Sequence, residues 1–244
     1  MRYLVGFVAV MALGVVPLVG CSGTEGTGGS GGDGGAGGSG GGGSMVTVTG
    51  QVRENSADGA VPGPTVANAM VSVLGTSNTA TTDEDGNFSI MAPIGTRLFL
   101  SEATGSWGGM LAEDVSPPGI TGLALEVIPE TLVDQTASDL GVTADVSRGV
   151  VAVVFDHTRT VGGETAEIIV DTSELSFVFL AGEAQEGNTL FPGGGDVIFL
   201  NVDPANVVTA TATSATQQPC PLEFPAATYS VRAKVITEIE VVCP

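Results

Sequence analysis

The chain offers few side chains for covalent or acid–base chemistry: one histidine, His157, and three cysteines, Cys21, Cys220 and Cys243. A hydrolytic triad would need a serine on a sharp turn between a strand and a helix, and no such Gly-x-Ser-x-Gly elbow accompanies His157. A zinc site is not expected either, because the histidine is far from the cysteines in sequence and no two cysteines are close together. We therefore predict a protein without catalytic residues, bound metal or cofactor, with His157 in a loop.

The N-terminal segment has the composition of an export signal. Arg2 is followed by an almost uninterrupted apolar run over residues 3–16. A short basic start and an apolar run of this length are typical of a secretory signal, and the run is too short for a spanning helix. We predict that residues 1–20 are a signal peptide.

The residues at the end of this signal, Leu18, Val19, Gly20 and Cys21, resemble the lipobox of bacterial lipoproteins. The resemblance implies that the signal is cut before Cys21, that its thiol is acylated, and that the lipid bilayer is therefore a partner. The alternative is an ordinary signal peptide with an A-x-A-like cleavage site, and no such site is evident. Many proteobacteria read an aspartate after the cysteine as an inner-membrane retention signal. Ser22 stands there, so we expect a cell-envelope location with the outer membrane favoured.

Residues 21–44 are predicted to be a disordered tether. From Ser22 to Ser44, 14 of the 23 residues are glycine. Glycine has no side chain to bury and loses the most entropy on ordering. A random coil of this length spans about 26 Å root-mean-square, which would hold the following domains away from the lipid surface.

The two remaining cysteines are expected to pair. Two cysteines in an exported domain usually form a disulfide, so we predict a bond between Cys220 and Cys243. Such a loop would stabilise the fold by about 3 kcal/mol in the chain-entropy model. It would attach the C-terminus to the preceding Pro-rich loop.

The charge balance narrows the class of partner. The net charge is −20 with Arg2 included. A strongly acidic chain does not bind nucleic acid, which needs a basic surface. Calcium binding is one interpretation of so many acidic residues, and solvated, self-repelling surfaces are the simpler one.

Behind the tether, short alternating apolar runs broken by Gly, Pro, Asn and Asp predict an all-β fold. Residues 69–76, 80–90 and 93–95 resemble the carboxypeptidase regulatory-like domain, a transthyretin-like Greek-key β-sandwich close to collagen-adhesin B repeats. The resemblance implies such a sandwich over residues 45–128 and no peptidase activity.

The turn Asp83-Glu84-Asp85-Gly86-Asn87 has two interpretations. Alternating acidic residues before a glycine resemble the start of a calcium loop, but the glutamate that would close such a loop is missing. Asp-Gly between two strand-like runs is a strong hairpin signal, because glycine adopts a positive φ without steric cost. We favour the hairpin.

A connector and a second sandwich follow. Residues 129–148 contain a short helix at 130–140, preceded by Pro129 and followed by Gly141. Strand patterns return over residues 149–244, and the run 229–242 is expected to be split by a turn at Ala233-Lys234.

A faint repeat at an offset of 111 residues suggests that the second sandwich is a divergent copy of the first, although chance also explains four matches. The matched pairs are Phe88 with Phe199, Met91 with Val202, Pro93 with Pro204 and Gly95 with Asn206.

The sequence thus favours a non-catalytic surface lipoprotein that displays tandem β-sandwiches for scaffolding, adhesion or protein interaction. The alternative is a module that binds carbohydrate or peptidoglycan. For that alternative, Trp107 is the candidate ligand contact, because glycines flank it in a loop-like setting. The other interpretation is that Trp107 closes one end of a sandwich.

Overall fold

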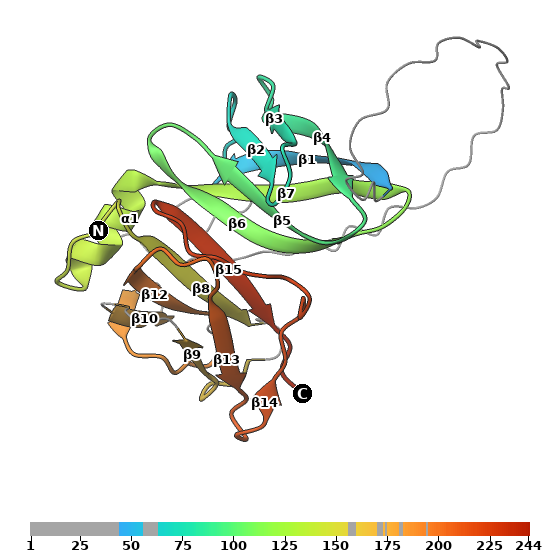
Figure 1. Cartoon of the computed structure of the whole chain (residues 1–244). Coiled ribbons are helices and arrows are strands. Elements are labelled where there is room, and N and C mark those ends of the chain that lie inside the picture. The colour runs from blue at the N-terminus through green and yellow to red at the C-terminus, as the bar shows by residue number, and fades with distance from the viewer. Residues whose placement is uncertain are drawn as a thin grey trace, which may run out of the picture.

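The computed structural model describes residues 44–55, 63–155, 160–169, 173, 175–180, 183–193 and 195–244. The lipobox residues 18–21, the tether up to residue 43 and His157 lie outside these ranges. Within them, the structure contains no helix with the length and apolar character needed to cross a membrane. The predicted all-β class is confirmed, with two packed β-sandwiches and one short helix (Figure 1).

The first sandwich is built from the described residues up to Pro129. One sheet has the order β4-β1-β7, and β3-β2-β5-β6 lie in the other. In β4 the residues Phe88, Ile90 and Ala92 are buried while their neighbours are exposed, which is the predicted period of two. The strands are β1 (Met45–Glu54), β2 (Met70–Val73), β3 (Thr79–Thr81), β4 (Asn87–Pro93), β5 (Gly95–Glu102), β6 (Ser106–Val115) and β7 (Gly119–Pro129).

The acidic turn joins the two sheets of this sandwich and is not a two-stranded hairpin. It connects β3, which pairs with β2, to β4, which pairs with β1. Its tight bend is as expected, with Gly86 at φ 77°. The Asp83 carboxylate accepts the backbone N–H groups of Asp85 at 3.0 Å and Asn87 at 2.8 Å. These hydrogen bonds lower the pKa of Asp83. The carboxylate therefore stabilises the turn itself.

The predicted helix is present as α1 (Glu130–Asp139). Pro129 precedes its first turn, and Gly141 adopts φ 78° just past its end. The N–H of Val142 bonds the carbonyl of Ala137 and the N–H of Gly141 bonds that of Ser138, which is the Schellman pattern. Its buried residues, including Val133 and Thr136, face the body of the protein.

The second sandwich follows α1. Strands β11-β10-β12-β8-β15 form one sheet and β14-β13-β9 the other. Every residue of β12 is buried, because both faces of this sheet are covered. The strands are β8 (Gly149–Phe155), β9 (Thr165–Ile169), β10 (Leu175–Leu180), β11 (Glu183–Glu186), β12 (Asp196–Val202), β13 (Thr209–Thr213), β14 (Pro219–Cys220) and β15 (Val235–Val241).

The two sandwiches have similar strand pairings in part. In the first sandwich β1 pairs with β4 antiparallel and with β7 parallel, and in the second β8 pairs with β12 antiparallel and with β15 parallel. The opposite sheets match as well, since β2-β5-β6 corresponds to β9-β13-β14. Phe88 and Phe199, matched in the sequence repeat, occupy the equivalent strands β4 and β12.

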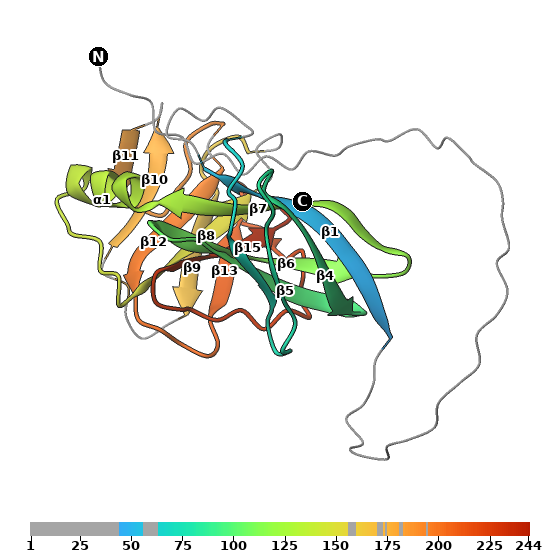
Figure 2. The same cartoon turned by 90° about the horizontal axis from the view of Figure 1, so that it is seen from above.

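The two sandwiches share a continuous sheet, which the sequence did not predict. The turn at Ala233-Lys234 is present, with Lys234 at φ 58°, and β15 begins directly after it. β15 then pairs parallel with β6 of the first sandwich over three residue pairs, and the two strands run side by side in Figures 1 and 2. As a result, Leu100 and Met110 of the first sandwich pack in the core of the second.

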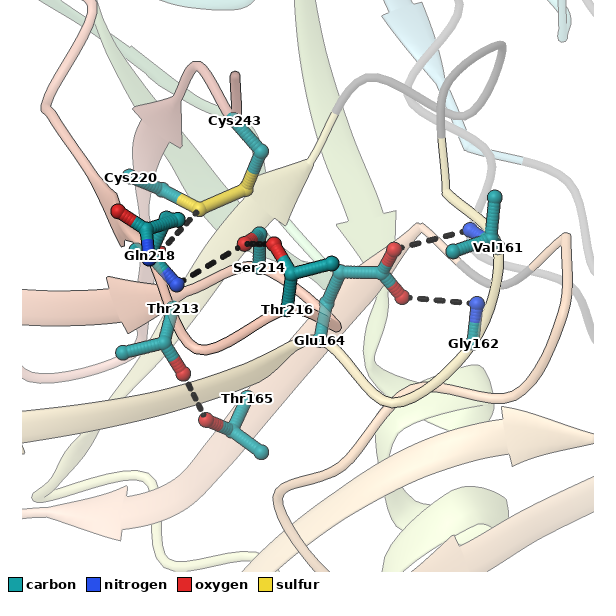
Figure 3. The surroundings of a disulfide bond; sticks show 10 residues. All are labelled: Val161, Gly162, Glu164, Thr165, Thr213, Ser214, Thr216, Gln218, Cys220 and Cys243. Carbon is teal, nitrogen blue, oxygen red and sulfur yellow. Dashed lines mark hydrogen bonds between the residues drawn. A yellow bond between two sulfur atoms is a disulfide. The ribbon is translucent and has the colours of Figure 1, made fainter.

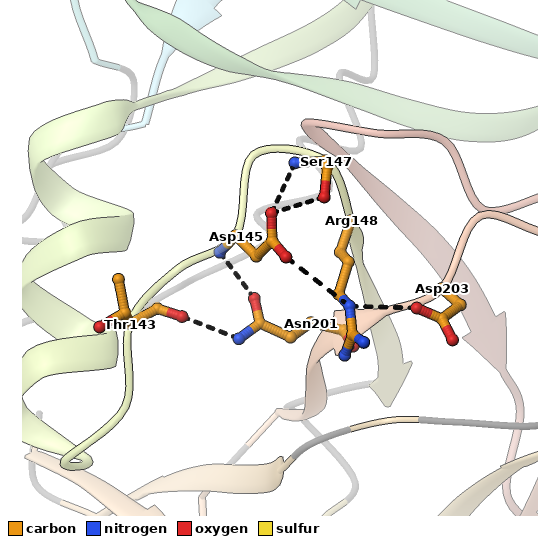
Figure 4. A network of polar contacts seen from close by, with 6 residues as sticks. All are labelled: Thr143, Asp145, Ser147, Arg148, Asn201 and Asp203. Carbon is orange, nitrogen blue, oxygen red and sulfur yellow. Dashed lines mark hydrogen bonds and ion pairs between the residues drawn. The ribbon is translucent and has the colours of Figure 1, made fainter.

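A polar network holds the connector between α1 and β8 against β12 (Figure 4). The side-chain amide of Asn201 donates to the carbonyl of Thr143 at 2.8 Å and accepts the N–H of Asp145 at 2.8 Å. The Arg148 guanidinium lies 3.0 Å from the Asp203 carboxylate and 3.8 Å from that of Asp145. Asn201 is almost fully buried, so these bonds fix the path of the chain into the second sandwich.

Candidate functional site

A cavity of about 40 Å³ lies at the junction of the two sandwiches. Its walls are the outer face of β8, β10, β12 and β15, the end of β7 and the buried side of α1. The lining is mostly apolar and belongs to the core cluster that joins the two sandwiches. The apolar lining residues include Ile128, Val133, Val150, Ala152, Ile198 and Ile236.

Three carboxyl groups line this apolar cavity, each from a different strand. Asp196 is the first residue of β12 and pairs with Val154, Glu238 of β15 pairs with Ala152, and Glu126 comes from β7. Asn55 donates its side-chain N–H to Glu126 Oε2 at 2.8 Å. Neither Asp196 nor Glu238 has a lysine or arginine partner among the described residues.

Burial without a cation raises the pKa of all three carboxyl groups. Loss of hydration raises the pKa of Asp196 to about 7, and the charge of Glu126 adds to this effect. Loss of hydration also raises the pKa of Glu238 well above its usual range, with further contributions from Glu126, Asp196 and Glu240. The pKa of Glu126 rises for the same first reason, and the bond from Asn55 opposes that rise.

Two polar atoms on the cavity wall have no hydrogen-bond partner among the described residues. They are Asp196 Oδ1 and Thr136 Oγ1, both buried, in residues that are only 7% and 6% exposed. Buried polar groups in folded proteins are almost always hydrogen-bonded. These atoms therefore indicate a place where a polar molecule or group can bind.

A second cluster of acidic side chains, formed by Glu240, Glu113 and Glu223, lies further along β15. The β15–β6 pairing ends at Thr237 and Met110, and continuing its register would set Glu240 opposite Glu113. Loss of hydration and the nearby Glu223 raise the pKa of Glu240. Like charges directly opposite each other weaken a strand pair, which accounts for the short ladder between the sandwiches.

The structure corrects the expected setting of Trp107. This residue lies within β6 and not in a loop, and its side chain is fully buried in the core cluster shared with α1. The flanking Gly108 and Gly109 serve close packing, since a Cβ on Gly109 would lie 2.2 Å from the carbonyl oxygen of Glu126. A fully buried indole has no face on which a sugar could stack.

The predicted disulfide between Cys220 and Cys243 is confirmed, with the two Cα atoms 4.4 Å apart (Figure 3). It links the short strand β14 to the segment that follows β15. Ser214 supports the adjoining turn, because its hydroxyl accepts the N–H of Gln218 at 3.1 Å. The strand β14, which carries Cys220, lies on the far side of the second sandwich from α1 (Figure 1).

The remaining predicted sites have different outcomes. The lipidation residue Cys21 and the single histidine lie outside the described residues. In the part of the chain that the structure describes, no group of three or more His, Cys, Asp or Glu side chains is placed to hold a metal ion. Sequence reasoning missed the cavity carboxyls. The only available signal was the acidic pair Glu238 and Glu240 inside an apolar run, which reads as a solvent-facing pattern.

Comparisons with known proteins give no family. No family model matches the chain, and neither does any curated protein sequence. A solved type II cohesin–X–dockerin complex from Acetivibrio cellulolyticus is similar to 34% of this chain at 23% identity, with a TM-score of 0.28. This chain spans 58% of that one.

Two further structures are similar over 82% of this chain. One is the shaft pilin SpaA from Lactobacillus rhamnosus GG, at 12% sequence identity, 98% coverage of its chain and a TM-score of 0.25. The other is a DUF3823 family protein from Parabacteroides merdae, at 10% sequence identity, 99% coverage of its chain and a TM-score of 0.26. At these TM-scores the similarity says nothing about what this chain binds.

Proposed function

We propose that this protein is a lipid-anchored cell-envelope protein whose two fused β-sandwiches form a non-catalytic module for protein interaction. The observation that carries the proposal is the junction cavity, where Asp196 and Glu238 have no lysine or arginine partner among the described residues. In the same part of the chain, Asp196 Oδ1 and Thr136 Oγ1 have no hydrogen-bond partner. Cavities between domains are common ligand sites, and unpaired polar groups give such a site its specificity.

The proposed anchor rests on the lipobox-like residues Leu18, Val19, Gly20 and Cys21 and on the Gly-rich tether behind them. Two or more acyl chains give stable membrane attachment. The resemblance of the first sandwich to the carboxypeptidase regulatory-like family supports a display module rather than an enzyme.

The anchor is tested by replacing the acylated residue. In a bacterium with an outer membrane, the wild type should take up an alkyne-tagged fatty acid and sediment with outer-membrane fragments. Cys21→Ser should lose the label and be released from the membranes, whereas Ser22→Ala should keep both. A labelled Cys21→Ser chain, or an unlabelled wild type, would refute the anchor.

The interaction role is separated from the glycan alternative by two binding measurements. Crosslinking in whole cells should attach the wild type to a defined envelope protein, and purified peptidoglycan sacculi should not sediment it. Sedimentation with sacculi and no protein crosslink would favour the carbohydrate-binding alternative instead.

A further inference from the structure

The junction cavity combines an apolar wall with an acidic end. Ile128, Val133 and Ile236 line its apolar part, and Glu126, Asp196 and Glu238 supply the carboxyl groups. A ligand that fits both parts needs an aliphatic stem and a cationic head. Among protein side chains, lysine and arginine have this build.

The described basic residues do not supply that cation. The single lysine of the chain, Lys234, pairs with Glu130 at the start of α1. Arg148 pairs with Asp203, and Arg53 donates to the carbonyl of Gly63 at 2.9 Å. None of these three side chains therefore neutralises the negative charge of the cavity carboxyl groups.

The unpaired atoms distinguish the cavity from an ordinary acidic surface patch. Asp196 Oδ1 and Thr136 Oγ1 come from β12 and α1, and both are buried on its wall. An ammonium group donates three hydrogen bonds and is compact, whereas guanidinium is a wide planar fork. A space of about 40 Å³ suits the compact head.

We propose that the junction cavity is a docking site for a lysine side chain presented by a partner protein. The ammonium group binds the carboxylates of Asp196 and Glu238 and the hydroxyl of Thr136, and the methylene stem packs on the apolar wall. This inference rests on the proposed interaction function and names the chemistry of the partner.

Docking is linked to pH by the acidic groups that face the cavity. These are Glu126 from β7, Asp196 from β12 and Glu238 from β15. Glu240 lies further along β15, outside the lining, and its charge acts on Glu238. The lining residues of α1, β8 and β10 carry no charge. An ammonium binds the ionised carboxylates, and burial raises the pKa of Asp196 to about 7. Binding therefore strengthens as pH rises through 7 and releases protons.

The test is a titration of the full lipidated chain in detergent micelles with the peptide Ac-Gly-Lys-Gly-NH2. The indole N–H signal of Trp107 is the readout, because this residue belongs to the core cluster that lines the cavity. We expect a saturable shift whose dissociation constant falls at least about tenfold from pH 6 to pH 8. Ac-Gly-Gln-Gly-NH2 should produce no shift.

Matched variants separate docking from general attraction to an acidic protein. Asp196→Asn and Glu238→Gln should each weaken binding at least about tenfold. Glu84→Gln removes the same charge from an exposed turn and should leave binding within about twofold. Equal weakening by all three variants, or no saturable shift in the wild type, overturns the proposal.

One further outcome also counts against it. If the wild-type protein does not bind the peptide but is still crosslinked to an envelope protein, the lysine site is overturned and the proposed function stands.

Discussion

The fold makes the carboxyl group of Asp196 a weaker acid than a free aspartate side chain. It lies in an apolar cavity without a cation, and its pKa rises to about 7 from an ordinary value of 3.8. The folded chain therefore keeps a proton that the unfolded chain releases above about pH 4. As pH rises between these two values, the free energy of unfolding falls, by at most about 4 kcal/mol.

Asp196→Asn should remove this pH dependence. The substitution keeps the shape of the side chain and cannot ionise, so the variant should gain roughly 1–3 kcal/mol at pH 8 and little at pH 4. Urea denaturation at the two pH values measures the difference, with Glu84→Gln as the exposed control. A variant less stable than the wild type at pH 8 would show that ionised Asp196 is compensated in the fold.

The disulfide between Cys220 and Cys243 should contribute measurable stability. Reduction should lower the free energy of unfolding by about 3 kcal/mol, because the open loop gains freedom in the unfolded chain. Denaturant midpoints with and without reductant give this value, and the double variant Cys220→Ala/Cys243→Ala should not respond to reductant. Mass spectrometry after alkylation should find no free thiol at either cysteine, and two alkylated cysteines without reductant would contradict the bond.

At the residue scale, the sequence predicted the disulfide and missed the carboxyl cluster, for a physical reason. Pairing of Cys220 and Cys243 was predicted from the expected export signal and the lack of other partners. Glu238 looks like a solvent-facing residue because it alternates with apolar residues in β15, and Asp196 looks like one because it precedes the apolar run of β12. Asp196 is buried and Glu238 is partly buried because α1 and the end of β7 cover the outer face of the sheet, and no local pattern encodes that contact.

At the scale of elements, Gly109 of β6 controls the approach of β7. A Cβ at this position would lie 2.2 Å from the carbonyl oxygen of Glu126, and backbone atoms cannot move aside as a side chain can. Gly109→Ala should therefore cost more than about 2 kcal/mol. Gly75→Ala is the control, since Gly75 has open space around it and should lose only about 1 kcal/mol for its positive φ. Equal losses in thermal unfolding would contradict the close approach.

Local elements were well predicted and their long-range pairing was not. The period-two strands, α1 between Pro129 and Gly141, and the turn before β15 all follow from patterns of a few residues. The turn at Asp83 was expected to close a hairpin, and it crosses between sheets because β4 pairs with β1. The parallel pairing of β15 with β6 joins strands far apart in the chain, and short-range patterns do not specify such a partner.

At the scale of the whole molecule, the shared sheet should make the two sandwiches unfold together. Val48 lies in the core of the first sandwich and Val153 in that of the second, and both are fully buried. Val48→Ala and Val153→Ala should each lower the stability of one common transition by roughly 2 kcal/mol. Far-UV circular dichroism and Trp107 fluorescence should give coincident curves. Two resolved transitions, with each variant shifting only one of them, would show that the sandwiches unfold independently.

The position of β15 has a consequence for how the chain becomes folded. This strand comes last in the described sequence and lies in the middle of the shared sheet, between β8 and β6. Until β15 has been synthesised and has paired, β6 and β8 each have a free edge with unpaired backbone N–H and C=O groups. Such edges pair with strands of other molecules. We therefore expect a chain that stops after Lys234 to aggregate, whereas one that stops after Val242 should lack only the disulfide and remain monomeric. Analytical ultracentrifugation of the two truncated chains would distinguish them. The last strand of the described sequence would thus determine whether a newly synthesised chain folds to a monomer or aggregates.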